Sequence, residues 1–427
     1  MRKVKASIII PSYNARQRLY LNLAALNCQS YEGDDVEVIV VDNGSSDNTM
    51  EMLKSFRLKY PMKILRIEEN RGIAHGRNEG ILHAEGDILI FHDSDMLASG
   101  NFIERHLEEH EKPGKVVCGL FWRRIFTYYY KGFTPDQVSN FEKVRERMNI
   151  KRLSVYWDEF PLLTEEQVRN EDLTPYSFDL NFGFIDDMKM ILKKYGRTFE
   201  GYNLPWRFCI TNNLSVERQR VMDVGMFDAN IVRYGYEDYD LGIRLHKSGC
   251  KFVMADDIVS LHQEHPPNYR GDDLIVNINY MCDKYNNIYF IDVPLVCISD
   301  LMNIEPEELN RTVGDINRLL SNCRYHDILE LFLDLLQVLR KRFFSPAEEN
   351  SREVFLKVAH KLDYYVQKVL SLEKEEGAED LVKQLSSLMK TALGIDFRML
   401  LDANRPVNGL SRGVRKTSVK EKDGKYE

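Results

Sequence analysis

The chain has 427 residues, 44% of them hydrophobic, and a formal net charge of −8. This size predicts a large core and more than one domain, or one domain with a substantial appendage. No window approaches the roughly 18 consecutive apolar residues of a membrane span, and the acidic balance argues against general nucleic-acid binding. The start, "MRKVKASIIIPSYN", has no cleavage site and is expected to form the first strand of a cytoplasmic protein. Seven widely spaced cysteines predict reduced thiols.

Strand-like runs alternate with helical patterns over the first hundred residues. The runs are "ASIIIP", "VEVIVVD", "MKILRI" and "DILIF", and the segments between them have helical spacing. This alternation predicts βαβ units, and runs dominated by Ile and Val predict a parallel sheet that is covered on both faces. Ligands bind such sheets beyond the carboxyl ends of the strands.

Three of these strands end in polar residues. The first ends at "PSYN", the second at "DNGSSD", and the strand that ends at Phe91 continues into His92-Asp93-Ser94-Asp95. Because the carboxyl ends of parallel strands meet at one edge, we expect acids, amides and hydroxyls to gather there. That edge is the predicted site.

Asp93 and Asp95 are two carboxylates that follow a buried strand and would repel each other. A cation is therefore expected between them, since magnesium and manganese are typically held by one or two carboxylates while substrate phosphates complete the shell. The alternative is a solvated turn, in which Asp and Ser are common.

A second acidic motif is "YGYEDYDLGIRL", which contains Glu237, Asp238 and Asp240. Acidic residues are favoured in the first turn of a helix, and this preference is enough to explain one of the three acids, Asp240. A catalytic interpretation has a carboxylate of this motif removing a proton from an acceptor hydroxyl. His262 ends a later β-rich run and is either an ordinary surface residue or an imidazole ligand that would favour manganese over magnesium.

The rest of the chain is less regular. Residues 120–205 predict an insertion over the site. Its aromatic and basic stretch "FWRRIFTYYYKGF" is an acceptor platform, a membrane-edge contact or core. Residues 298–410 predict a helical domain that pairs protomers, binds a carrier or peptide acceptor, or braces the catalytic domain. It includes a helix start at Ser345 to Glu348 and an apolar stripe. The stripe consists of Phe355, Val358, Leu362, Tyr365 and Val369. Residues 411–427 predict a disordered basic tail.

Five segments in this order make the chain resemble glycosyltransferase family 2. They are "SIIIPSYN", "VIVVDNGSSDNT", "NRGIAHGRNEG", "GDILIFHDSD" and "GYEDYDLGIRL", and they cover about residues 6 to 265, with 120–205 poorly matched. The resemblance implies a GT-A fold over residues 1–297, which is an α/β domain with a Rossmann-like, mostly parallel central sheet. The all-α part would be a C-terminal extension.

The resemblance also implies a role for each motif residue. Asp42 would read the uracil and ribose, and Asp95 would bind the metal, with Asp93 meeting the ribose or the same metal. His262 would be a third metal ligand, Asp238 the general base beside Glu237, and the cation Mn²⁺ rather than Mg²⁺. The remaining nucleotide-binding residues would be Pro11, Tyr13, Asn14, Asn70, Gly72, Arg77 and Asn78.

The implied enzyme is an inverting hexosyltransferase of polysaccharide biosynthesis. It would move a sugar from a nucleotide-sugar donor, a UDP-sugar, to a hydroxyl of a glycan, lipid-linked glycan or peptide. Asn43 stands where the family usually has the second acid of "D-D-G-S", and the "Q-x-x-R-W" element of processive synthases is absent. We therefore expect a non-processive enzyme, cytoplasmic or peripheral at a membrane, with the C-terminal helices available to form a homo-oligomer.

The sequence offers three alternatives to this activity. A metal-dependent nucleotidyltransferase and a non-catalytic nucleotide-sugar binder remain open at this point. A nicotinamide-dependent dehydrogenase is disfavoured, because the turn after the first strand, "PSYNAR", contains no glycine of the G-x-G-x-x-G type.

Overall fold

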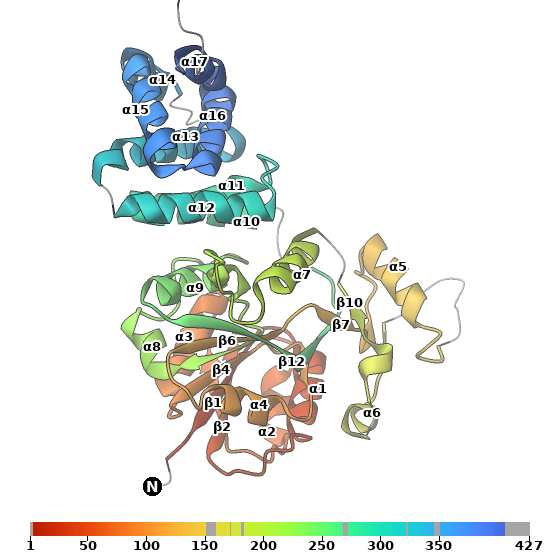
Figure 1. The fold of residues 1–427 in the computed structure, drawn as a ribbon. Coiled ribbons are helices and arrows are strands. Elements are labelled where there is room, and N and C mark those ends of the chain that lie inside the picture. Colours follow the sequence, from red (N-terminus) through yellow and green to blue (C-terminus); the bar gives the residue numbers. More distant parts are fainter. Residues whose placement is uncertain are drawn as a thin grey trace, which may run out of the picture.

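A mixed sheet forms the centre of the N-terminal part. The computed structural model describes residues 3–150, 159–170, 172–180, 183–267, 272–321, 323–345 and 351–405. The sheet has ten strands in the order β10-β7-β12-β6-β11-β4-β1-β2-β3, with β5 paired to β12 (Figure 1). Neighbours from β3 to β4 are parallel, and β11 runs antiparallel between β4 and β6. This is the mostly parallel α/β sheet that the sequence predicts.

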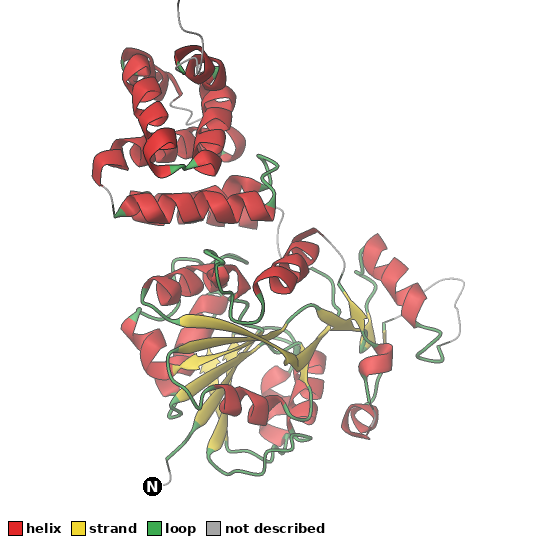
Figure 2. Ribbon diagram, in the orientation of Figure 1, coloured by secondary structure: helices red, strands yellow, loops and turns green. Residues whose placement is uncertain are grey.

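The strands of this sheet are short except for β12. Their bounds are β1 (Ala6–Ser12), β2 (Val36–Asn43), β3 (Met62–Ile67), β4 (Ile88–His92), β5 (Met96–Ala98), β6 (Lys115–Leu120), β7 (Arg123–Ile125), β10 (Phe178–Asp179), β11 (Asn213–Glu217) and β12 (Lys251–Gln263). Every residue of β1 and β2 is buried, because helices cover both faces of the sheet (Figure 2). Continuous Ile and Val runs are the sequence form of such doubly covered strands.

Two apolar cores lie on the two faces of the sheet. Ile8 and Ile10 point into the core that includes α1 (Arg16–Leu26), α2 (Thr49–Ser55) and α4 (Phe102–Glu109). Ile9 points the other way, because successive strand side chains alternate between faces. That second core includes α3 (Ile73–His83), α7 (Gly183–Tyr195), α8 (Arg218–Asp223), η2 (Pro205–Phe208) and α9 (Glu237–Lys247).

The described residues between 123 and 179, which we call the side lobe, extend from one end of the sheet (Figure 1). The lobe contains β7, β8 (Tyr128–Tyr129), α5 (Pro135–Val144), β9 (Phe160–Pro161), α6 (Glu165–Asn170), η1 (Thr174–Tyr176) and β10. Phe126, Tyr129, Phe133 and Phe141 form its own small core. Most aromatic side chains of "FWRRIFTYYYKGF" are therefore buried, whereas Tyr128 and Tyr130 are half-buried.

The C-terminal part is helical, and it starts earlier than the predicted residue 298. Its helices are α10 (Asp273–Lys284), α11 (Asp292–Ser299), α12 (Pro306–Leu320), α13 (His326–Phe344), α14 (Ser351–His360), α15 (Leu362–Glu376), α16 (Glu379–Leu393) and α17 (Phe397–Asn404), with η3 (Ile288–Phe290) and η4 (Cys323–Tyr325). The predicted boundary falls inside α11. The stripe from Phe355 to Val369 is divided between two helices, α14 and α15. Residues 346–348 of the predicted helix start, and the predicted tail 411–427, lie outside the described residues.

The helical part contacts the sheet domain through α10, α11 and α12, which lie nearest to it (Figure 1). Asn310 of α12 accepts a hydrogen bond from the backbone N–H of Asn203 at 2.7 Å, and Asp292 accepts one from the buried indole N–H of Trp206 at 3.1 Å. These two hydrogen bonds hold the helical part against the sheet domain. Among the described residues, no helix has the length and apolar content to cross a bilayer.

Candidate active site

The pairing of β5 with β12 brings residues that are far apart in the sequence together at the predicted edge of the sheet. Asp93 and Asp95 follow β4, and β5 begins one residue later at Met96, which pairs with His262 of β12. The backbone N–H of Gln263 donates to the carbonyl oxygen of Asp95 at 2.8 Å. This antiparallel register places His262 beside Asp95 although the two residues are far apart in the sequence.

Asp95, His262 and His265 form one cluster, which we call the Asp-His cluster. One ligand atom from each residue lies within 4.8 Å of the others. The Asp95 Oδ2 atom is 3.0 Å from His265 Nε2 and 3.7 Å from His262 Nε2. His265 was not predicted; the signal that could have found it is the His-x-x-His spacing in "LHQEHPP".

The donor set of the Asp-His cluster fits a divalent cation. His265 Nδ1 lies 2.8 Å from the carbonyl oxygen of Pro266, so the proton of a neutral ring belongs on Nδ1. The lone pair of His265 Nε2 then faces the negatively charged Asp95 carboxylate. A positive charge between the two would relieve their repulsion. Burial and the positive charge of Arg124 lower the pKa of His262, which favours the neutral imidazole that metals require. Burial would raise the pKa of Asp95, but His262 and His265 outweigh it and lower this pKa when their rings carry the protons that a bound cation would replace.

Arg77 joins the two acidic motifs. Its side chain is 1% exposed and lies 2.8 Å from Asp93, 3.0 Å from Glu237 and 3.0 Å from Asp238. We call these four residues the Arg77 cluster. The guanidinium of Arg77 binds these carboxylates, and its implied place on the nucleotide side stays a prediction. Asp93 is likewise turned to Arg77 and does not belong to the Asp-His cluster of the described residues.

The two acids of the E-D pair differ in their surroundings. Burial, followed by the negative charge of Asp238, raises the pKa of Glu237, and its Oε2 atom is buried without a hydrogen-bond partner in the described structure. Asp238 accepts hydrogen bonds from the Thr211 hydroxyl at 2.6 Å and the Thr211 backbone N–H at 3.1 Å. Its side chain is 18% exposed, against 6% for Glu237. Asp238 is therefore the more accessible acid.

Burial also raises the pKa of Asp93, and the charges of Asp95 and Asp238 add to this effect while Arg77 opposes it. Three carboxylates thus share one fixed positive charge in a region with little water. Such an arrangement of perturbed groups is typical of catalytic sites.

The turns after β1 and β2 are held to each other. Asn14 has a positive φ of 48° and accepts a hydrogen bond from the backbone N–H of Ser46 at 2.8 Å, while the Ser45 hydroxyl accepts one from the Asn14 N–H at 2.9 Å. Asp42 is fully buried and pairs with Arg66. Pro11 is buried, whereas Tyr13 is 46% exposed.

Asn43 ties the turn after β2 to the segment that starts α3. Its side-chain N–H₂ donates to the Asn70 side-chain oxygen at 3.0 Å and to the Gly72 carbonyl at 2.9 Å. An ionised acid at this position could donate neither bond. Gly72 has φ of 89°, and a Cβ there would lie 2.7 Å from the Val232 carbonyl oxygen.

Asn78 has a structural position. Its amide donates to the Phe227 carbonyl at 2.8 Å and accepts from the Phe227 N–H at 2.9 Å. Both polar atoms are engaged by backbone, so Asn78 holds the segment before α9; its implied place on the nucleotide side stays a prediction.

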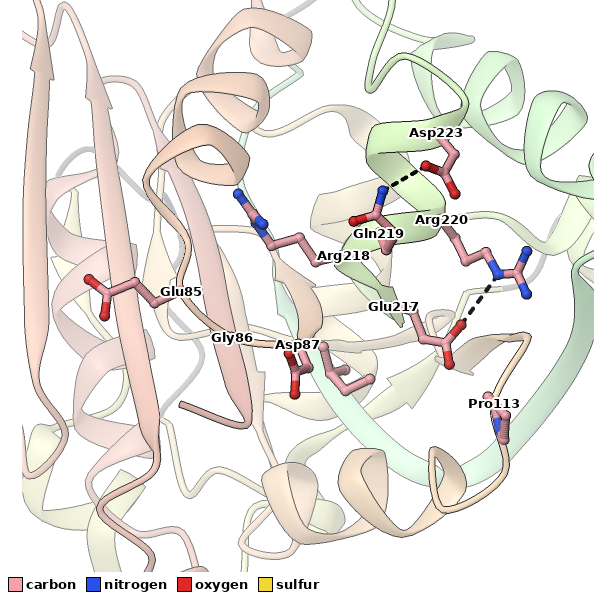
Figure 3. Close-up of a pocket in the computed structure, with 10 residues that line it drawn as sticks. Glu85, Gly86, Asp87, Pro113, Glu217, Arg218, Gln219, Arg220 and Asp223 are labelled. Carbon is pink, nitrogen blue, oxygen red and sulfur yellow. Dashed lines mark hydrogen bonds and ion pairs between the residues drawn. The ribbon is translucent and has the colours of Figure 1, made fainter. Parts of the chain in front are cut away.

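A surface hollow lies at the opposite end of β4 from Asp93 and Asp95 (Figure 3). It is lined by residues 85–88, Pro113, residues 217–220 and Asp223. Its side chains pair with one another, as Arg220 does with Glu217 and Gln219 with Asp223. The hollow contains none of the residues of the two clusters.

Comparisons with known proteins bear on the family of this chain. A model of the family described as "Glycosyl transferase family 2" matches residues 7–185, and so includes most of the 120–205 segment. The uncharacterized glycosyltransferase YfnE of Bacillus subtilis (strain 168) is 45% identical over 399 residues, which cover 93% of this chain and 99% of that protein. Validoxylamine A glucosyltransferase of Streptomyces hygroscopicus subsp. limoneus is 26% identical over 283 residues, 65% of this chain and 55% of that protein.

Among solved structures, S. aureus TarS 1-349 in complex with UDP aligns over 93% of this chain and 90% of its own, with a TM-score of 0.42 and 16% identity. The likeness to the Bacillus protein extends along almost the entire length of both chains. The chain belongs to glycosyltransferase family 2.

Proposed function

We propose that this glycosyltransferase moves a hexose from a UDP-sugar to an acceptor hydroxyl with inversion at the anomeric carbon. One observation carries the proposal: carboxylates of both acidic motifs meet at the buried guanidinium of Arg77, on a sheet edge that also carries the Asp-His cluster. A donor held near Asp95 would thus present its sugar close to Asp238. The product would be a glycan built without processive elongation.

The donor side is supported by the Asp-His cluster and the first two strand ends. A divalent cation held by Asp95, His262 and His265 would neutralise charge on the diphosphate leaving group. Two imidazoles beside one carboxylate favour Mn²⁺ over Mg²⁺. Tyr13 offers an exposed ring against which a nucleoside can pack, and Asp42 of β2 pairs in register with Ser12, the residue before Tyr13.

Asp238 is the proposed base. It takes the proton from the acceptor hydroxyl as that oxygen bonds to the anomeric carbon, and the bond from that carbon to the diphosphate oxygen breaks. The nucleoside diphosphate leaves with the electron pair, so a single displacement inverts the configuration. The Thr211 and Arg77 hydrogen bonds fix the carboxylate in position before the reaction. Glu237 is more deeply buried and supports the same guanidinium.

The side lobe is the proposed acceptor side. It is joined to the Asp-His cluster by Gln137, which donates to Glu264 at 2.8 Å, and by the Thr127 hydroxyl, which donates to Gln263 at 2.8 Å. Tyr130 accepts a hydrogen bond from Arg18 at 3.2 Å, and is half-buried at the junction. An acceptor glycan, lipid-linked glycan or peptide would meet these residues next to the donor.

Calorimetric titration with UDP, GDP and dTDP, each in Mn²⁺ and in EDTA, tests the donor and metal. We expect UDP binding that requires Mn²⁺ and is lost in Asp95→Ala. Asp256→Asn, on the exposed face of β12, is the matched control and should bind as wild type. Binding that ignores the metal would refute the metal assignment, and release of pyrophosphate instead of UDP from a UDP-sugar would make the protein a nucleotidyltransferase.

A further inference from the structure

The backbone before α9, residues 231–236, holds an unusual conformation. Gly235 and Tyr236 have consecutive positive φ angles of 94° and 71°. Tyr236 is the N-cap of α9 and makes no side-chain capping hydrogen bond. A non-glycine residue in this region costs roughly 1–2 kcal/mol, so contacts from elsewhere must fix it. We call residues 231–236 the base loop, because Glu237 and Asp238 follow directly.

Asn277 of α10 supplies these contacts. Its side-chain N–H₂ group lies 2.7 Å from the Gly235 carbonyl, 3.0 Å from that of Tyr234 and 3.2 Å from that of Arg233. An amide has two N–H groups, so three consecutive carbonyls share them. Asn277 is 3% exposed, which means that water cannot replace these bonds if the amide is removed.

Two turns further along α10, a second pair of residues holds the other side of the E-D pair. Asp240 is fully buried in the first turn of α9 and accepts a hydrogen bond from the Tyr285 hydroxyl at 2.8 Å. Lys284 reaches Asp240 and also Asp228, the latter at 2.6 Å. Asn277 and Lys284 are seven residues apart and therefore lie on the same face of the helix.

We propose that α10 belongs to the catalytic apparatus, with Asn277 as a positioning residue that sets the base loop and hence the direction of Asp238. The helical part then acts on the transfer step itself and is more than a platform for the acceptor. This inference rests on the proposed role of Asp238 as the base. Displacing a catalytic group by about 1 Å can cost a hundredfold in rate, so the contact has a kinetic consequence.

Asn277→Ala tests the inference, with Asn279→Ala as the matched control. Asn279 is on the same helix, but it accepts a hydrogen bond from Arg340 of α13 at 2.9 Å and does not contact the base loop. The readouts are amide hydrogen exchange of residues 231–241, UDP affinity in Mn²⁺, and release of UDP from UDP-glucose or UDP-N-acetylglucosamine with water as acceptor.

We expect Asn277→Ala to increase exchange in residues 231–241 at least tenfold and to lower turnover tenfold to a hundredfold, with UDP affinity within twofold of wild type. Asn279→Ala should leave these values unchanged. If a folded Asn277→Ala protein exchanges the amide hydrogens of the base loop at the wild-type rate, the inference is overturned. If that variant does not fold, Asn277→Asp gives the same comparison, because it keeps the size of the side chain but removes the N–H donors to the base loop, and unchanged exchange there overturns the inference too.

Asp238→Asn separates this inference from the proposed function. If Asp238→Asn is inactive while Asn277→Ala has wild-type turnover and exchange, α10 has no positioning role and the proposed function stands. If Asp238→Asn retains wild-type turnover, the base assignment is wrong whatever Asn277→Ala does; the exchange measurement then still reports whether Asn277 holds the loop.

Discussion

Replacing Arg77 with Met removes the only positive charge that the three carboxylates of the Arg77 cluster share within the described structure. The side chain is 1% exposed, so water does not take its place. Removing one partner from a buried ion pair costs about 3–5 kcal/mol.

The loss should depend on pH. Without the guanidinium, these acids bind protons more tightly in the folded than in the unfolded protein, so stability falls as pH rises above the unfolded carboxyl pKa of about 4. Burial already raises the pKa of Glu237 to about 7 and that of Asp93 to about 6 in the wild type, so the deficit of Arg77→Met is small at pH 5 and grows as pH rises through 7 to 8. Met was chosen because it preserves length and apolar bulk.

Urea unfolding at pH 5, 7 and 8 measures this deficit. Arg71→Met is the control, because Arg71 is an exposed arginine of the same segment and its loss should cost less than about 0.5 kcal/mol. A deficit below about 1 kcal/mol at pH 7, or one that does not change with pH, would refute the reasoning. Transfer activity should also be lost in Arg77→Met.

Three further predictions concern other parts of the site. Asn43→Asp restores the usual family acid but loses the bonds to Asn70 and Gly72, so we expect about 1–3 kcal/mol lower stability and weaker UDP binding by calorimetry; wild-type values in both would contradict this. His265→Ala should weaken Mn²⁺-dependent UDP binding at least about tenfold, as Asp95→Ala does, whereas a wild-type titration would remove His265 from the metal site. Lys284 and Tyr280 overcome the effect of burial and lower the pKa of Asp228 to about 2. Asp228 therefore contributes on the order of 2 kcal/mol that is present above about pH 4 and lost as pH falls towards 2. In Asp228→Asn, the free energy of unfolding measured in urea should therefore change less between about pH 4 and pH 2 than it does in wild type. An unchanged slope of this free energy against pH would disprove the contribution.

The sheet could be predicted because its signals are local. Ile8, Ile9 and Ile10 serve two cores at once, and only a doubly covered strand tolerates such a run. The gathering of the polar strand ends at one edge could be predicted because parallel strands all end on the same side of the sheet. Asp95 and His262 were predicted as neighbours from the resemblance, and the pairing of β5 with β12 explains their closeness.

The parts that were missed depend on long-range packing. Nothing local in "NRGIAHGRNEG" indicates that Arg77 binds three carboxylates, one of them 161 residues away. His265 reaches Asp95 because the chain leaves β12 beside the turn after β4. The helical part was predicted to begin too late, since the first turns of α10 read "DLIVNINY", whose β-branched residues obscure the helical period.

The most direct test of the central claim compares turnover and donor affinity in Asp238→Asn. A base acts in the transition state, so its removal should lower kcat by about 10²–10⁴ while UDP-sugar affinity in Mn²⁺ stays within a few-fold of wild type. Equal loss of donor affinity would place Asp238 in the nucleotide pocket, and unchanged turnover would show that another group removes the proton.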